Sequence, residues 1–202
     1  MIFIVGAHAT GKTYLADYLL KFNFFKIDLG PVLRLLYDKF GKGYTFQEWI
    51  KKGEEISGKN FTDDLIVEEI ISTIRNLEIM KRDAMDFVII GSRSVEGLKY
   101  ILEKVGKFNN IKPKIIFLDA PFDVMYENYK KREGIEITRD EFERIIEKDR
   151  QMGLEDLRDI ADFVILNDTT REKLVDQALV LLRDELKYAI PEHRLETKIK
   201  MS

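Results

Sequence analysis

The 202-residue sequence contains no cysteine, two histidines and a single tryptophan. The absence of cysteine excludes a disulfide framework, a thiolate metal site and a cysteine nucleophile. No apolar run approaches the roughly 18 residues of a membrane-spanning helix. A net charge of -3, with the two signs interspersed, argues against an extended nucleic-acid-binding surface. We therefore expect a cytoplasmic globular protein, a monomer or homodimer, whose partners are neither nucleic acid nor a membrane.

A phosphate-binding pattern stands near the start of the chain. Residues 6–13 read Gly-Ala-His-Ala-Thr-Gly-Lys-Thr and satisfy G-x-x-x-x-G-K-[ST], between an apolar run and a segment with helical periodicity. In that context the glycines let successive backbone N–H groups point into one concavity at a helix N-terminus, where an anion binds. The residues predicted to bind a nucleoside triphosphate are Gly6, Ala7, His8, Ala9, Thr10, Gly11, Lys12 and Thr13.

Two side chains of this pattern have separate tasks in phosphoryl transfer. Lys12 reaches the β- and γ-phosphates, and the Thr13 hydroxyl is placed to ligate a magnesium ion. We therefore expect ATP with Mg²⁺ as its cofactor, with Lys12 catalytic and Thr13 the metal ligand. His8 is expected to contribute only its backbone N–H.

Short apolar segments alternate with helical patterns along the chain. The apolar segments are β-branched or aromatic, which is typical of buried parallel strands, and they cover residues 2–5, 24–27, 87–90, 114–118 and 163–166. Helical periodicity covers residues 12–22, 31–40, 61–80, 95–105, 122–132, 139–152 and 171–186. This order predicts an α/β protein with the three-layer fold of P-loop NTPases and a five-stranded parallel sheet.

We expect a single domain over residues 1–190 and a flexible tail at residues 191–202. Two stretches exceed what crossover connections need. Residues 30–82 are rich in aromatic side chains, and residues 132–150 contain four arginines. Taken singly, they are explained by a small local core and by a solvated helix with charge pairs. Together, on either side of the phosphate loop, they indicate a helical acceptor-binding insertion and a short lid.

Three further motifs accompany the phosphate loop. Residues 30–34, Gly-Pro-Val-Leu-Arg, are similar to G-D-x-x-R; residues 91–94, Gly-Ser-Arg-Ser, are similar to D-G-x-R-S; residues 161–167, Ala-Asp-Phe-Val-Ile-Leu-Asn, are similar to A-D-x-V-I-x-N. With these motifs the chain resembles the P-loop nucleoside monophosphate kinase superfamily, which includes adenylate kinases and dephospho-CoA kinases. Within it, the chain resembles an archaeal group of nucleotide-kinase-like proteins.

The chain departs from this family at four positions. Gly30 stands where dephospho-CoA kinases have the second aspartate of the I-D-x-D stretch, whose first aspartate Asp28 resembles. Ile90 stands where many relatives have an aspartate that helps to hold the magnesium hydration shell. Pro31 replaces the aspartate of G-D-x-x-R, and Asn128 stands where relatives often have an arginine. Asp28, at the end of the second predicted strand, is the best-placed alternative carboxylate. Altered acceptor chemistry explains these departures, and so does a loss of catalysis.

On the donor side, the resemblance implies roles for five residues. Arg132 is the first choice to supply positive charge to the transferred phosphoryl group, and Asn167 lies against the adenine. The arginines assigned to the lid are Arg139, Arg144 and Arg150.

On the acceptor side, the resemblance implies that Arg34 and Arg93 grip an anionic acceptor, because a guanidinium binds phosphate in a two-pronged fork. Asp28 has three alternative roles. It orients an acceptor hydroxyl or takes its proton, it orders magnesium-bound water, or it caps the helix that follows.

The favoured function is ATP-dependent transfer of the γ-phosphoryl group to a small phosphorylated acceptor, with a nucleoside or deoxynucleoside monophosphate as first choice. The alternatives are phosphorylation of a hydroxyl, as in dephospho-CoA kinases, an NTPase switch or assembly factor that acts on a protein partner, and a nucleotide sensor without catalysis. The fourth predicted strand ends in Leu-Asp-Ala-Pro instead of an N-K-x-D sequence, which argues against a GTPase.

Overall fold

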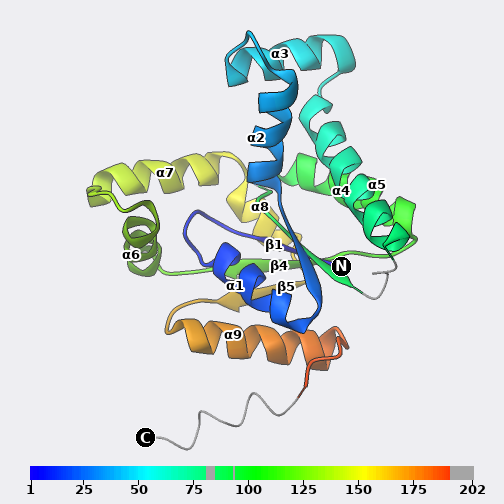
Figure 1. Cartoon of the computed structure of the whole chain (residues 1–202). Coiled ribbons are helices and arrows are strands. Elements are labelled where there is room, and N and C mark those ends of the chain that lie inside the picture. The colour runs from blue at the N-terminus through cyan, green and yellow to red at the C-terminus, as the bar shows by residue number, and fades with distance from the viewer. Residues whose placement is uncertain (81–84, 93, 192–202) are drawn as a thin grey trace, which may run out of the picture.

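The computed structural model describes residues 1–80, 85–92 and 94–191, so the tail predicted at residues 191–202 lies almost entirely outside it. In the described part, the strands form one parallel sheet in the order β2-β3-β1-β4-β5 (Figure 1). Helices cover both faces, so the predicted three-layer α/β fold is confirmed. The strands are β1 (Ile2–Val5), β2 (Phe24–Asp28), β3 (Asp86–Ile90), β4 (Lys114–Asp119) and β5 (Phe163–Leu166).

The centre of the sheet determines where a ligand binds. β1 pairs with β3 on one side and with β4 on the other, so that Ile2 is the partner of both Val88 and Lys114. The chain crosses β1 on its way from β3 to β4, and the strand order reverses there. Open α/β sheets bind ligands at this reversal, beyond the carboxyl ends of the strands. The loop of residues 6–11, which follows β1, lies at this point.

Helices pack on the two faces of the sheet because the side chains of β1 alternate between two cores. The first face is covered by α1 (Lys12–Leu19) and α9 (Arg171–Val180), and the second by α4 (Phe61–Ile79), α5 (Val95–Asn109) and α8 (Leu154–Asp159). Ile2 and Ile4 belong to the first core, and Phe3 and Val5 belong to the second. Burial on both faces explains why this strand is a continuous apolar run.

Some elements differ from the sequence prediction. β5 is predicted to be buried, but it is an edge strand in which Val164 is 48% exposed and Leu166 is 45% exposed, and only Ile165 is buried. The sequence prediction also lacks α8, which is too short to show periodicity, and α3 (Phe46–Ser57). A 3₁₀-helical turn over Leu20–Phe22 continues α1, and a π-helical turn over Leu181–Glu185 continues α9. Within the described ranges, no helix combines the length and apolar character that crossing a membrane requires.

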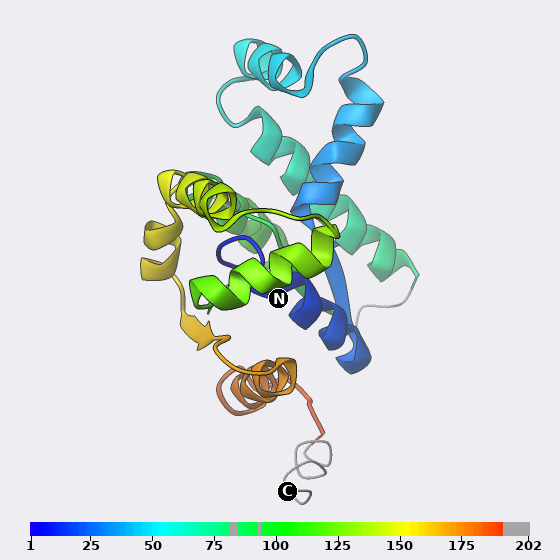
Figure 2. The same ribbon diagram turned by 90° about the vertical axis from the view of Figure 1, so that its left-hand side faces the viewer.

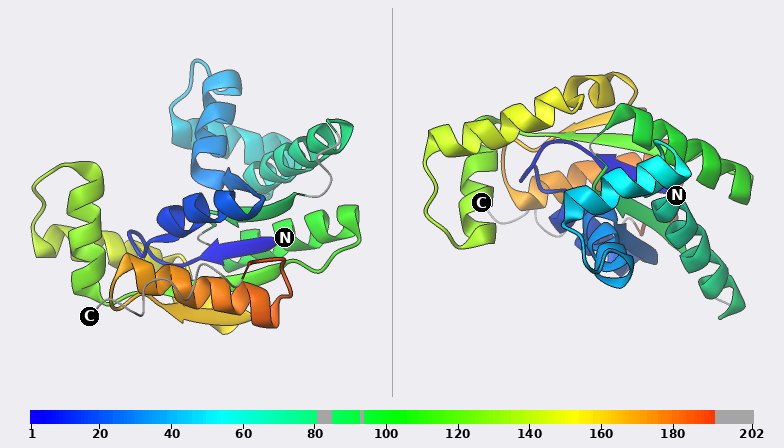
Figure 3. Two further views of the ribbon diagram at one scale, coloured as in Figure 1. Left: turned by 60° about the horizontal axis from the view of Figure 1, so that its bottom comes forward. Right: turned by 90° about the horizontal axis from the view of Figure 1, so that it is seen from above.

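Two groups of helices project from the sheet on either side of the loop at residues 6–11 (Figures 2 and 3). The first arm consists of α2 (Leu29–Phe40), α3 and α4. Its aromatic rings pack on one another: the ring centroids of Tyr37 and Phe46 are 5.3 Å apart, and those of Trp49 and Phe61 are 5.2 Å apart. The explanation of this segment as a small local core is therefore correct.

The second arm consists of α6 (Phe122–Glu133) and α7 (Arg139–Gln151). Phe142 is fully buried, and its ring centroid lies 5.4 Å from that of Phe122 and 5.1 Å from that of Tyr129. The same hydrophobic cluster contains Ala7 and Ala9. The segment predicted as a lid is thus part of a helix pair that packs directly on the phosphate loop.

Candidate active site

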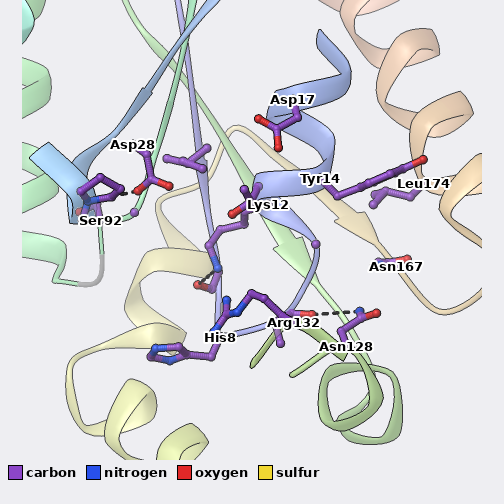
Figure 4. Close-up of a pocket in the computed structure, with 18 of the residues that line it drawn as sticks. His8, Lys12, Tyr14, Asp17, Asp28, Ser92, Asn128, Arg132, Asn167 and Leu174 are labelled. Atoms are coloured by element: carbon purple, nitrogen blue, oxygen red, sulfur yellow. Dashed lines mark hydrogen bonds between the residues drawn. The ribbon is translucent and has the colours of Figure 1, made fainter. Parts of the chain in front are cut away.

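A cleft of about 710 Å³ opens at the carboxyl edge of the sheet, between the two arms (Figure 4). It is lined by the phosphate loop and the start of α1, by the junction of β2 and α2, by the turn after β3, and by parts of α6 and α9. The sequence-predicted residues that it brings together are Gly6, His8, Ala9, Gly11, Lys12, Thr13, Asp28, Arg34, Arg132 and Asn167.

The path of the loop requires glycine at both ends. Gly6 has a φ of 142°, and a Cβ atom on it would lie 2.2 Å from the carbonyl oxygen of Leu118. Gly11 has a φ of 102°, and a Cβ atom there would lie 3.0 Å from Nδ2 of Asn167. Any larger residue would be strained in its backbone and would collide with a neighbour. These are the two glycines of the phosphate-binding pattern.

Lys12 and Thr10 hold the loop from within. The Lys12 ammonium donates to the carbonyl oxygens of Gly6 at 2.9 Å and of Ala7 at 2.5 Å. Thr10, which is 1% exposed, donates its hydroxyl to the same Ala7 carbonyl at 3.1 Å. The positive charge of Lys12 therefore lies inside the curve of the loop, where the N–H groups and the helix N-terminus already favour an anion.

Two amides hold the loop from outside. Nδ2 of Asn128, on α6, donates to the carbonyl of Ala9 at 3.1 Å, and Nδ2 of Asn167, just after β5, donates to the carbonyl of Thr10 at 2.9 Å. Asn167 is only 5% exposed. Its amide thus positions the loop, and the predicted contact of Asn167 with adenine stays a prediction. The departure at Asn128 also has a structural explanation, since this residue bonds the loop backbone.

α7 contributes a carboxylate to the loop. The backbone N–H of His8 donates to Oδ2 of Asp149 at 2.7 Å, and His8 Nδ1 lies 2.8 and 2.7 Å from the two carboxylate oxygens. Asp149 is 4% exposed. Because a carboxylate only accepts hydrogen bonds, Nδ1 carries a hydrogen. The backbone N–H of His8, predicted to serve the nucleotide, is thus bonded to Asp149 in this structure, and the His8 ring also ties α7 to the loop.

The residues near Thr13 fit a magnesium ion that arrives with a nucleotide. The Thr13 side chain is exposed on the cleft, and the Asp28 carboxylate lines the same cleft. Among the described residues, no three acidic or histidine side chains form a metal cage. Magnesium bound through phosphate oxygens needs only one or two protein ligands besides water, so this donor set is sufficient.

Asp28 ends β2 and also caps α2. Its Oδ1 accepts a hydrogen bond from the backbone N–H of Gly30 at 3.2 Å, and α2 begins at Leu29, two residues before the predicted start. In the sheet, Asp28 is the register partner of Ile90, which is 3% exposed. A carboxylate is thus present on the strand next to the position where the family's aspartate is absent. The predicted capping role of Asp28 is therefore confirmed. Asp28 also lines the cleft, and its two predicted catalytic roles stay predictions.

Two glycines leave room around this carboxylate. A Cβ atom on Gly91, whose φ is 107°, would lie 3.3 Å from Oδ1 of Asp28. A Cβ atom on Gly30 would lie 3.5 Å from the same oxygen and 3.6 Å from Nη1 of Arg34. Asp28 and the exposed Arg34 therefore lie on either side of Gly30, and both line the cleft. Arg93 lies outside the described residues, and its contact with an acceptor stays a prediction.

Arg132 is the arginine of the second arm that reaches the cleft. Its side chain lines the cleft together with the phosphate loop (Figure 4). Its Nε donates to Glu133 at 2.6 Å, and its guanidinium carbon lies 5.3 Å from the centroid of the Tyr129 ring. Both contacts are to residues of the same helix, α6, and the predicted role of Arg132 in phosphoryl transfer stays a prediction.

The other three arginines predicted for the lid do not line the cleft: Arg139, Arg144 and Arg150 are exposed on α7. Arg139 forms an ion pair with Asp123, which raises the pKa of the guanidinium. Nη1 of Arg150 lies 3.3 Å from Glu147 on the same helix. Their charge pairs lie outside the cleft in this structure, and their assignment to a lid stays a prediction.

Sequence reasoning gave no site role to several residues, among them Tyr14, Arg171 and Asp149. Tyr14 is assigned to the core by its helical spacing, and Arg171 stands at the start of α9, yet both line the cleft. Asp149 is buried against His8, 141 residues away in the sequence. No local pattern indicates a contact of that length.

Solved structures share this architecture. A shikimate kinase from Acinetobacter baumannii, in complex with shikimate, has a TM-score of 0.51 and 15% identity over 94% of each chain. A shikimate kinase from Bacteroides thetaiotaomicron has a TM-score of 0.54 and 20% identity, covering 90% of this chain and 97% of its own. The chain therefore has the P-loop kinase fold.

A relative by sequence is known as well. A UPF0200 protein from Sulfurisphaera tokodaii is 28% identical to the chain over 187 residues, which covers 91% of this chain and 96% of that protein. No model of a known protein family matches the chain.

Proposed function

We propose that the protein is an ATP-dependent phosphotransferase that moves the γ-phosphoryl group of MgATP to a hydroxyl group of a small anionic acceptor. The observation that carries this proposal is the Asp28 carboxylate, which lines the same cleft as the phosphate loop and Arg34. Phosphoryl transfer requires positioning and positive charge more than covalent chemistry by the protein. The cleft supplies both.

On the donor side, the loop N–H groups and Lys12 bind the β- and γ-phosphates. As phosphate oxygens enter the loop, the Lys12 ammonium exchanges its bonds to the Gly6 and Ala7 carbonyls for bonds to phosphate. Arg132 places a second positive charge where charge develops during transfer. Magnesium, held by the Thr13 hydroxyl and the phosphates, supplies further charge neutralisation when it is bound.

On the acceptor side, Arg34 binds the anionic group of the acceptor and Asp28 orients its hydroxyl. The hydroxyl oxygen forms a bond to the γ-phosphorus, and the bond from that phosphorus to the β–γ bridging oxygen breaks, so that ADP leaves. The proton of the hydroxyl passes to Asp28, which acts as general base. The cap bond from Gly30 to Oδ1 fixes the orientation of the carboxylate.

A nucleoside monophosphate is the second candidate acceptor, and the presence of Arg34 on the cleft favours it. The aromatic residues of the first arm argue for the smaller acceptor, because they pack against one another and do not line the cleft. A base of the acceptor would therefore find none of these rings to stack on. The rings concerned are Tyr37, Phe46, Trp49 and Phe61.

The test is ATP consumption with magnesium against a panel of acceptors, with Lys12→Ala as control. The panel contains small hydroxylated acids, among them shikimate, which the similar Acinetobacter kinase binds, together with dephospho-CoA and ribo- and deoxynucleoside monophosphates. Phosphorus NMR of the product shows which oxygen received the phosphoryl group. A phosphorylated hydroxyl that disappears with Lys12→Ala supports the proposal.

The other outcomes each decide against it. Conversion of an added nucleoside monophosphate into its own diphosphate establishes the second candidate. Hydrolysis that no acceptor stimulates indicates an NTPase switch. Tight binding of MgATP with no turnover on any panel member indicates a sensor.

A further inference from the structure

The donor side of the cleft contains a pair of side chains that the phosphate chemistry does not use. Tyr14 on α1 and Arg171 on α9 both line the cleft. The guanidinium carbon of Arg171 lies 4.9 Å from the centroid of the Tyr14 ring, within the range of a cation–π contact. A guanidinium that lies over an aromatic ring offers its outer face to a further planar group.

This pair stands next to the phosphate loop. Tyr14 directly follows Thr13, and Arg171 begins the helix whose Leu174 Cδ2 would lie 3.3 Å from a Cβ atom on Gly11. A triphosphate in the loop carries its nucleoside on the α-phosphate, away from the transferred group. A nucleobase is the planar part of that nucleoside, and it finds a matching flat surface on this wall.

The side-chain amides of the cleft have other tasks. Nδ2 of Asn128 donates to the Ala9 carbonyl, and Nδ2 of Asn167 donates to the Thr10 carbonyl. Each amide therefore uses one of its two N–H donors to bond the loop backbone, which fixes both side chains against the loop. Stacking recognises the face of a base, and every base has such a face.

We propose that Tyr14 and Arg171 form a stacking platform for the nucleobase of the donor, and that the protein accepts ATP, GTP, CTP and UTP with similar affinity. The proposal rests on the proposed function only in that the donor is a nucleoside triphosphate. A site that reads hydrogen-bonding edges discriminates by about 10⁴-fold or more. For stacking alone we expect dissociation constants within about tenfold of one another.

The experiment is calorimetric titration with magnesium and without acceptor, so that its result does not depend on phosphoryl transfer. The ligands are the four nucleoside triphosphates and inorganic tripolyphosphate, which has no base. The variants are Arg171→Ala and Tyr14→Leu. The control is Lys173→Ala, which removes a positive charge from the same turn of α9, where the side chain is exposed and does not line the cleft.

We expect Arg171→Ala and Tyr14→Leu to weaken binding of all four nucleotides by about tenfold and that of tripolyphosphate by less than about twofold. Lys173→Ala should change none of them by more than about twofold. Circular dichroism verifies that each variant is folded. If Arg171→Ala or Tyr14→Leu is not folded, Arg171→Gln or Tyr14→Met replaces it, and a loss of affinity confined to the nucleotides supports the platform.

Three results would overturn the proposal. An equal loss of tripolyphosphate binding makes Arg171 a phosphate ligand. A preference of more than about 100-fold for one base in the wild-type protein means that a base edge is read. Unchanged nucleotide affinity in both folded variants removes the platform. Absence of phosphoryl transfer, by contrast, refutes the proposed function and leaves a base-dependent loss of binding intact.

Discussion

The two sides of the cleft are built differently. On the donor side, the phosphate loop is held by groups from distant parts of the chain: Asn128, Asp149 and Asn167 all bond its backbone. On the acceptor side, Asp28 is held by the N–H of Gly30, two residues away, and Arg34 is exposed on the following turn. The donor side is therefore a fixed part of the fold, whereas the acceptor side is set by local contacts.

This difference explains why one fold carries many substrates. A triphosphate is the same anion in every reaction of this kind, so long-range bonds that fix its loop are compatible with all of them. Acceptors differ in shape and charge, and residues held by a single helical turn change without disturbing the sheet. Function in such a fold is a property of the site that is placed on it.

The largest effect is expected from removing the central charge of the donor side. Lys12→Ala should lower phosphoryl transfer by about 10³-fold or more, because the γ-phosphate loses its closest cation. The measurement is the initial rate of ATP consumption with the acceptor that the panel identifies. Lys173→Ala, off the cleft, should retain the wild-type rate within about twofold, and a comparable loss in both variants would contradict the assignment of Lys12.

The second prediction separates Arg132 from the other arginines of its arm. Arg132→Ala should lower kcat by about 10²- to 10³-fold, because a charge-stabilising group on the cleft is lost. Arg139→Ala should leave kcat within about twofold of the wild type, since that guanidinium pairs with Asp123 outside the cleft. If the arm closes over the substrates and brings Arg139 in, the two variants will lose activity alike.

The third prediction concerns the stability of the donor side. Asn167→Ala leaves the carbonyl of the buried Thr10 without its donor and should lower the free energy of unfolding by about 1–3 kcal/mol. Asn128→Ala, at a half-buried position, should cost about 0.5–1.5 kcal/mol. Urea unfolding followed by circular dichroism measures both. A larger loss for Asn128→Ala than for Asn167→Ala would mean that burial does not set the strength of these bonds.

The sequence predicts the features that depend on neighbouring residues. The apolar run at residues 2–5, the two glycines and the Lys12–Thr13 pair lie within one stretch, and their spacing determines strand, loop and helix together. Alternation of strands and helices then predicts the parallel sheet and places the loop at its carboxyl edge. α3 also has a local signal, because Thr45 and Glu48 form a capping box.

Contacts between distant residues are beyond such reasoning. The helical pattern of residues 139–152 does not show which arginines turn toward the cleft, and the ion pair of Arg139 with Asp123 decides this in space. The bonds from Asp149 to His8 and from Asn167 to Thr10 join residues more than a hundred positions apart. Asp28 lies between these cases, since its cap is local but its place beside Ile90 depends on the sheet register.

The most direct test of the division between donor and acceptor sides is Asp28→Asn. Asparagine caps helices as well as aspartate does, so the fold and the loop should persist. We predict a dissociation constant for MgATP within about twofold of the wild type and a kcat that is about 10²- to 10⁴-fold lower, because the acceptor hydroxyl loses its base. An unchanged kcat, or MgATP binding that falls as much as turnover, would contradict the account.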